Sequence, residues 1–280
     1  MLNNYFVKYF GFFIVSFVLF SCSSDDTGET CCDVYPIETR KFVSKIQFDS
    51  SLGASDVFYY NYNSDNNLTS IEKNYTQVSF IYNENKISRV EISDNTTGEI
   101  LNYINYFYNN VGQLDYFEGN YLLRVVRYEY ENDRVVRMYR YNTITDLNNN
   151  QYVRLTDVEY NDGTKNVFEY KDYSFNGNLI KRGTRSYGIE DKRFYGEAAA
   201  LIDLPSGNNI IESFSYYSNY NLKAWKTSIN SNELELYRES FYENDTDDYC
   251  INWEMVYYNA SGDITKTENR LYEYIELEIN

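Results

Sequence analysis

Carboxylates are the side chains through which this chain would do acid–base chemistry. Its 280 residues include 42 aspartates and glutamates and no histidine, which excludes Ser-His-Asp and Cys-His catalysis, histidine-ligated zinc and a histidine general base. The 13 glycines are scattered singly, so no phosphate-binding loop is present. A glycoside hydrolase needs two acids at a fixed separation across a cleft, and so many carboxylates supply candidate pairs without selecting one. We therefore expect no enzyme and no cofactor, with a carboxylate-dependent glycan hydrolase as the alternative.

The densest acidic run, residues 243–248, offers oxygen ligands of the kind that calcium prefers. Its candidate ligands are Asp245, Asp247 and Asp248. The run lacks the glycine and the closing glutamate of an EF-hand loop, so a solvated acidic loop between two strands is the favoured interpretation. We expect no bound metal here.

Aromatic rings offer a second route to function. The chain contains 33 tyrosines and 17 phenylalanines, and Tyr59, Tyr103, Tyr217 and Trp225 are candidates for a flat platform that holds sugar rings or a partner protein. The same rings can serve as structural filler, because cross-strand pairs of rings stabilise hairpins. The structural use is the favoured interpretation for most of them.

The N-terminal residues 1–21 differ in composition from the rest of the chain. The apolar run 10–20 is too short for a confident membrane span but has the size of a signal-peptide core. It ends in Leu19-Phe20-Ser21-Cys22, which resembles a bacterial lipobox and implies that Cys22 is lipidated and becomes the new N-terminus. Several acyl chains on one cysteine would hold the protein on a membrane without help from the rest of the chain.

The segment that follows the lipobox resembles an export signal. Ser23-Ser24-Asp25-Asp26 resembles the export signal that sends Bacteroidetes lipoproteins to the outer face of the outer membrane. Residues 22–39 also read as a flexible tether, since the first part of this segment contains nothing to pack. We expect an outer-membrane lipoprotein, anchored by lipid and facing the cell exterior.

Three further cysteines remain in what should be an oxidising compartment. One hypothesis is a disulfide from Cys31 or Cys32 to Cys250, which would tie the start of the domain to its final third. Closing so long a loop would contribute roughly 5 kcal/mol in the loop-entropy model. A bridge between Cys31 and Cys32, or free thiols, are the alternatives.

The charge balance is strongly acidic. The formal net charge is −17 at pH 7, which argues against nucleic acid as a partner and against electrostatic adhesion to anionic lipid. It is also what a solvated, exposed surface looks like.

A recurring hairpin pattern organises the rest of the chain. In each unit two aromatic or apolar residues spaced by two share one face of a strand, and the first aliphatic residue of the return strand follows five or six positions after the second of them. The pairs are Tyr60/Tyr62, Phe80/Tyr82, Tyr106/Tyr108, Tyr128/Tyr130, Phe214/Tyr216 and Val256/Tyr258. In the strand 125–131, Val126, Tyr128 and Tyr130 should share one face, opposite Arg127 and Glu129.

These repeats predict an all-β domain over residues 40–280. We expect an antiparallel sheet of consecutive tyrosine-rich hairpins, curved or barrel-like, that opens with a strand at 41–48. From residue 183 to 211 the pattern lapses, and one short helical insert is predicted near 196–203, ended by Pro205.

The hairpins resemble degenerate YD repeats of the Rhs type. The residue after the second tyrosine is Asn63, Asn83, Asn109 or Asn259 where that pattern has aspartate. The order of lipobox, opening strand and tyrosine-rich hairpins more closely resembles Bacteroidetes lipoproteins of unknown function described as having a porin-like fold. Residues 187–194 resemble in part a motif found late in the sequences of those proteins. The resemblance implies a fold and no mechanism.

The sequence thus favours a surface-exposed lipoprotein that is a non-catalytic binding module for glycan or protein. A purely structural spacer is a further alternative, suggested by the repeats themselves. The expected partners are the membrane, through the lipid anchor, and a glycan or protein ligand.

Overall fold

The computed structural model describes residues 39–120, 124–160, 167–190, 220–229 and 233–279. The chain divides into two units, Met1–Pro36 and Ile37–Asn280, and every described residue belongs to the second. The predicted signal peptide, Cys22 and most of the tether therefore lie outside the described residues, as does the helical insert predicted near 196–203.

Sixteen strands and one short helix make up the described part of the chain. They are β1 (Thr39–Ser50), β2 (Ser55–Tyr62), β3 (Leu68–Lys73), β4 (Thr76–Asn83), β5 (Lys86–Asp94), β6 (Ile100–Tyr108), β7 (Leu114–Gly119), β8 (Arg124–Glu131), β9 (Arg134–Tyr141), α1 (Ile144–Asn148), β10 (Arg154–Tyr160), β11 (Val167–Ser174), β12 (Leu179–Glu190), β13 (Tyr220–Ile229), β14 (Glu235–Asn244), β15 (Cys250–Tyr258) and β16 (Ile264–Glu278).

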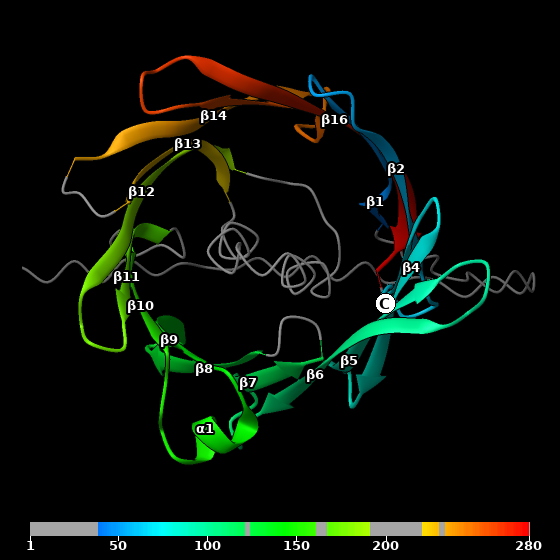
Figure 1. The fold of residues 1–280 in the computed structure, drawn as a ribbon. Helices are drawn as coiled ribbons and strands as arrows, with labels where there is room; N and C mark the ends of the chain where they lie inside the picture. The colour runs from blue at the N-terminus through cyan, green and yellow to red at the C-terminus, as the bar shows by residue number, and fades with distance from the viewer. Residues whose placement is uncertain (1–38, 121–123, 161–166, 191–219, 230–232, 280) are drawn as a thin grey trace, which may run out of the picture. The chain divides into compact units, whose positions relative to one another are not determined.

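The strands form one closed antiparallel barrel (Figure 1). Each strand pairs with its neighbour in sequence, and β16 returns to pair with β1 along the whole of that strand, from Thr39↔Glu278 to Ser50↔Glu268. The all-β prediction is confirmed, and of the two shapes that the sequence left open, curved or barrel-like, the sheet takes the closed one. Closure leaves no unpaired edge among the described strands for another chain to extend.

The predicted hairpins coincide with strand pairs. The first four units are β2–β3, β4–β5, β6–β7 and β8–β9, and the last is β15–β16. The first half of the fifth unit lies outside the described residues. The described helix, α1, was not predicted; it begins with a capping box in which Thr143 and Asp146 exchange side-chain-to-backbone hydrogen bonds.

Cross-strand register gives the sheet two distinct faces. In the β8–β9 pair, Val126 and Tyr128 lie opposite Arg140 and Met138 on one face, while Arg127 and Glu129 lie on the other. This confirms the face prediction for β8. We call the first side the packed face, because it carries the main cluster of buried side chains: Leu68, Ile71, Phe80, Ile87, Val90, Ile104, Tyr106, Leu114, Phe117, Val126, Met138 and Val158. The opposite side is the exposed face.

Tyrosine hydroxyls connect one hairpin to the next on the packed face. Each hairpin has a register shift near its turn, where the second tyrosine of the pair faces the first aliphatic residue of the return strand. Such a bulge interrupts the ladder of backbone hydrogen bonds. The carbonyl of that aliphatic residue accepts a hydrogen bond from the tyrosine of the following unit, and the pairs are Tyr82 to Leu68 at 2.8 Å, Tyr108 to Ile87 at 2.9 Å, Tyr130 to Leu114 at 2.8 Å and Tyr160 to Val135 at 2.8 Å.

Tyr130→Phe should lower the free energy of unfolding by about 1 kcal/mol, because the part-buried Leu114 carbonyl loses its donor. Urea denaturation measures the change. Tyr59→Phe is the control, since Tyr59 lies on the exposed face with half of its surface accessible. Equal losses in the two variants would contradict a structural role for these hydrogen bonds from tyrosine hydroxyls to backbone carbonyls.

The asparagine after the second tyrosine closes the longer turns. Asn109 Oδ1 accepts hydrogen bonds from the backbone N–H groups of Val111 and Gln113, and Asn63 and Asn259 do the same in their own turns. Asp245 plays this part between β14 and β15. The amide oxygen of these asparagines and the carboxylate of Asp245 thus close their turns with the same pair of hydrogen bonds.

Candidate functional site

A continuous row of mostly aromatic side chains crosses the exposed face from β6 to β11. Its members lie directly opposite one another in five successive strand pairs. In strand order they are Phe107, Tyr116, Arg127, Tyr139, Leu155 and Tyr173. At about 4.8 Å between strands the row spans about 24 Å. We call this set the aromatic row.

The rings of the row are arranged to offer flat surfaces. Phe107 and Tyr116 stack with their centroids 4.4 Å apart and their planes 13° apart, and Phe107 keeps 37% of its surface exposed. Tyr139 meets Tyr152 edge to face at 5.4 Å. The Arg127 guanidinium, whose Nε lies 3.3 Å from Asp115 Oδ1, separates the two pairs of rings. Planar rings beside a planar cation can stack against the faces of a ring-shaped ligand.

A row of charged side chains runs beside the aromatic row on the same face. On β8 to β11 each member lies two residues from the aromatic row, and the charge alternates in sign from Glu129 through Arg137 and Asp157 to Lys171. Arg182 on β12 lies opposite Lys171 and ends the row. Arg137 bridges its two neighbours, with Nε 3.0 Å from Asp157 Oδ1 and Nη1 3.5 Å from Glu129 Oε2. The Tyr139 hydroxyl donates to Glu129 at 2.9 Å, which links the two rows. Donors and acceptors therefore border the rings on one side.

The ionisation of these groups is fixed by their neighbours. The hydrogen bond to Asp157 raises the pKa of Arg137, so its guanidinium stays charged. Burial raises the pKa of the Tyr139 phenol, and the bond to Glu129 raises it further. Burial also raises the pKa of Tyr116, with Glu118 and Asp115 adding to the effect. The two phenols therefore keep their protons and remain hydrogen-bond donors.

The platform residues predicted from the sequence are not brought together. Tyr59 lies on β2, opposite Lys45 and Glu72 on the exposed face. Tyr103 lies on β6 with the Arg89 guanidinium 4.1 Å from its ring. Tyr217 lies outside the described residues, and for Trp225 the structure describes only the backbone, within β13.

The aromatic row itself was missed because most of its residues lie outside the tyrosine pairs that mark the hairpins. Phe107 is the middle residue of Tyr106-Phe107-Tyr108, whereas Tyr116 and Tyr139 lie on the return strands of their hairpins. The signal available in the sequence was the presence of these single rings on the return strands, which the hairpin pattern does not use. Aligning those positions across strands requires the register, which only the structure supplies.

The acidic run of residues 243–248 is organised around a lysine. Lys41 Nζ lies 3.1 Å from Asp245 Oδ2 and 2.6 Å from Asp247 Oδ2, and these hydrogen bonds raise the pKa of the lysine. Asp248 occupies a left-handed position in the turn, at φ 67°. Within the described ranges no group of three potential metal ligands occurs. An ammonium group thus takes the place that a cation would need.

The cysteine hypothesis stays a prediction. Cys250 is buried at the start of β15, and its carbonyl accepts a hydrogen bond from the Tyr274 hydroxyl at 2.5 Å. Cys31 and Cys32, its two candidate partners, lie outside the described residues.

No helix in the described part of the chain is long and apolar enough to cross a membrane.

Comparison with known proteins identifies the fold. No protein-family model matches the chain, and no curated protein does. Among solved structures the chain is similar to a porin-like protein from Bacteroides uniformis ATCC 8492, with 12% sequence identity and a TM-score of 0.54, over 83% of this chain and 98% of that one. It also matches a porin-like protein from Bacteroides vulgatus ATCC 8482, with 12% identity and a TM-score of 0.40, over 83% of this chain and 99% of that one.

The similarity to the Bacteroides uniformis protein is evidence for the fold alone. It supports the expected porin-like architecture, while the lipoprotein and YD-repeat assignments stay predictions. The described part of the chain is therefore a closed antiparallel β-barrel whose fold is similar to that of a porin-like protein from Bacteroides uniformis.

Proposed function

We propose that the protein is a non-catalytic, lipid-anchored binding module that holds a glycan against the aromatic row of β6–β11. The observation that carries the proposal is the alignment of Phe107, Tyr116, Arg127 and Tyr139 in one unbroken row on the exposed face. Flat rings bind the apolar faces of sugar rings, and bordering polar groups bind their hydroxyls. The charged row supplies those polar groups.

The length of the row suits an extended ligand. Six strands at about 4.8 Å spacing offer about 24 Å of continuous surface, which is enough for several sugar residues lying across the strands. A single ring on such a surface contributes about 1 kcal/mol, so affinity would come from several such contacts along one chain. An oligosaccharide is therefore a better ligand for this surface than a monosaccharide.

The electrostatics of the neighbouring carboxylates favour binding over hydrolysis. Burial alone would raise the pKa of Glu169, but hydrogen bonds from Lys171 and Arg182 outweigh burial and lower it. A glycosidase needs a carboxylic acid whose pKa is raised, so that it can donate a proton near neutral pH. Asp115, Glu129, Asp157 and Glu159 each lie in an ion pair with arginine or lysine.

An oligosaccharide array tests the proposal, with the mature chain as the probe. Phe107→Ala and Tyr116→Ala should each weaken binding about tenfold, because each removes one stacking surface worth about 1.4 kcal/mol. Phe241→Ala is the matched control: Phe241 is 52% exposed on the exposed face of β14, away from the row. A wild-type chain that binds no glycan on the array, or equal losses in all three variants, would refute the proposal.

The anchor is tested separately in cells. Proteinase K should digest the protein on intact cells if residues 23–26 direct it outward, and Cys22→Ser should release it from the membrane fraction. Protection until lysis would place the domain in the periplasm. Retention of the Cys22→Ser variant in the membrane fraction would contradict lipidation.

A further inference from the structure

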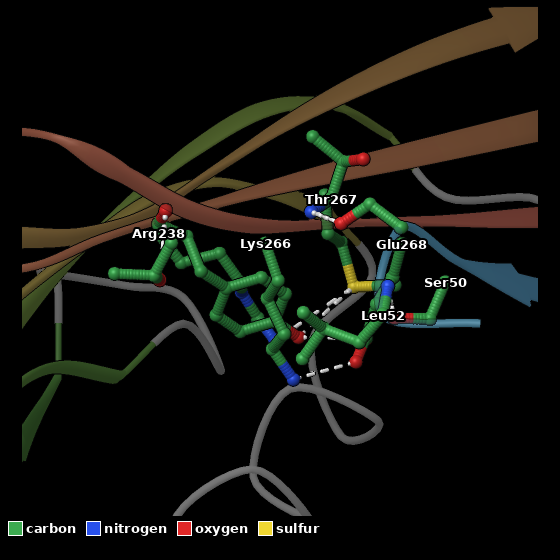
Figure 2. Close-up of polar contacts among 10 residues, drawn as sticks. Ser50, Leu52, Arg238, Lys266, Thr267 and Glu268 are labelled. Atoms are coloured by element: carbon green, nitrogen blue, oxygen red, sulfur yellow. Dashed lines mark hydrogen bonds and ion pairs between the residues drawn. The ribbon is translucent and has the colours of Figure 1, made fainter. Parts of the chain in front are cut away.

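A second cluster lies on the packed face of β14, β15 and β16, on the opposite side of the sheet from the aromatic row. Register places three rows there, one residue from each strand: Arg238, Tyr257 and Lys266; Ser240, Met255 and Glu268; and Tyr242, Trp253 and Arg270. Figure 2 shows Arg238, Lys266 and Glu268 on the same side of these strands. We call these nine residues the cationic cluster.

Cations and rings alternate within the cluster. The Arg270 guanidinium lies 4.8 Å from the ring centroid of Trp253. The Tyr242 ring stacks on the Trp253 ring, with their centroids 5.5 Å apart and their planes 19° apart. Lys266 Nζ lies 4.1 Å from the centroid of Tyr257. Arg238 lies 5.9 Å from both Trp253 and Tyr257. The rings hold the cationic groups in defined positions and orientations.

The charge of the cluster is positive in an otherwise acidic protein. Among its nine residues Glu268 is the one carboxylate, against three cations, whereas the whole chain has a net charge of −17. Glu268 is already engaged: it accepts from Lys266 Nζ at 2.6 Å and from the Tyr257 hydroxyl at 2.9 Å. The cluster therefore concentrates positive charge over aromatic rings.

The floor of the cluster contains a buried polar group. Ser240 is 6% exposed, and among the described residues its Oγ has no hydrogen-bond partner. A buried hydroxyl without a hydrogen bond costs free energy and marks a place that a ligand atom can satisfy. Ser240 lies beside Arg238 on β14, and Lys266 at the edge of the cluster keeps about a third of its side chain exposed. The cluster thus has a buried base and an accessible border.

We propose that the cationic cluster binds the anionic group of an acidic saccharide, a carboxylate or a sulfate, whose sugar ring stacks on Trp253 and Tyr242. Guanidinium groups bind planar carboxylates and sulfates through two parallel hydrogen bonds. The rings supply the stacking surface that a free anion does not use. This site uses the packed face and needs no residue of the aromatic row, so either site can fail without the other.

Tryptophan fluorescence provides a local readout. The chain contains 2 tryptophans, so a Trp225→Phe background leaves Trp253 as the single reporter beneath Arg270. The mature chain is titrated with a uronic-acid oligosaccharide, a sulfated oligosaccharide, a neutral oligosaccharide of the same length and inorganic sulfate. We expect an acidic oligosaccharide to change the emission of Trp253 at the lowest concentration, with an affinity that falls as salt is added.

Substitutions decide whether the cluster is responsible. Arg270→Gln should weaken binding of the acidic oligosaccharide about ten- to a hundredfold, the value of a charge-assisted hydrogen bond. Lys266→Gln, at the accessible border, is a second variant with an effect in the same direction. Lys45→Gln removes one positive charge from the exposed face, where Lys45 pairs with Glu273 outside both sites, and should leave the affinity within twofold.

Four outcomes would overturn the proposal. They are the absence of any response to acidic ligands, equal binding of the neutral oligosaccharide, binding of inorganic sulfate as tight as that of the acidic oligosaccharide, and unchanged affinity in both Arg270→Gln and Lys266→Gln. Circular dichroism of each variant confirms that the barrel is intact before its affinity is compared.

Discussion

Asp172→Ala is expected to lower the free energy of unfolding by about 3–5 kcal/mol, because it removes one partner of a buried ion pair. Asp172 on β11 accepts a hydrogen bond from the Thr156 hydroxyl on β10, and its Oδ2 lies 4.0 Å from Arg140 Nη1 on β9. Both charged side chains are almost fully buried, at 6% and 3% exposed. The loss therefore removes both a charge pair and a hydrogen-bond acceptor on the packed face.

Chemical denaturation of matched variants measures this effect. Asp157→Ala removes a carboxylate from the exposed face of the neighbouring strand, where its partner Arg137 is about half exposed. An exposed pair of this kind contributes about 0–1 kcal/mol. Similar losses in the two variants would show that burial of the Asp172 pair does not matter. Thr156→Val should have a smaller effect than Asp172→Ala, because it leaves the charge pair in place.

The hairpins were predictable because each one is determined by residues that are close in the sequence. The distance from the second tyrosine to the first aliphatic residue fixes the turn, and the turn fixes the pairing of two adjacent strands. The asparagine at Asn63, Asn109 or Asn259 adds a second local signal, because its side chain closes the turn by hydrogen bonds to residues two and four positions later.

Both candidate sites depend on information that is not local. Each bulge adds one residue to a strand and exchanges the face on which later residues lie. The position of Tyr116 opposite Arg127, or of Trp253 opposite Arg270, follows only when every shift is known. The contact of Lys41 with Asp245 spans 204 positions and depends on the closure of the barrel. The sequence therefore predicted the units of the sheet and not the surfaces that they build together.

The positive charge on the packed face was hidden for a related reason. In the sequence Arg238, Lys266 and Arg270 lie in strands that also carry acids, such as Glu239 and Glu273. Glu239 and Glu273 point to the opposite face, since side chains alternate along a strand. A net charge summed over the chain conceals a separation of charge between the two faces of one sheet.

The second large effect is expected where a glycine makes room for a ring. Gly183 on β12 lies opposite Tyr170 on β11, and a Cβ atom at this position would collide with the phenol ring. Tyr170 is 1% exposed, so its ring has little space into which to move. Gly183→Ala should therefore lower the free energy of unfolding by about 1–3 kcal/mol, the usual cost of overpacking a core.

A double-mutant cycle separates this clash from a general intolerance of alanine in β12. Tyr170→Ala removes the ring and is destabilising by itself, because it leaves a cavity on the packed face. In that background Gly183→Ala should cost nothing or should stabilise the strand, because glycine is a poorer strand residue than alanine once the ring is gone. Such a result gives a coupling energy of about 1–3 kcal/mol between two residues in contact. Additive losses would contradict the packing of Tyr170 over Gly183, and with it the close approach of β11 and β12 in this part of the barrel.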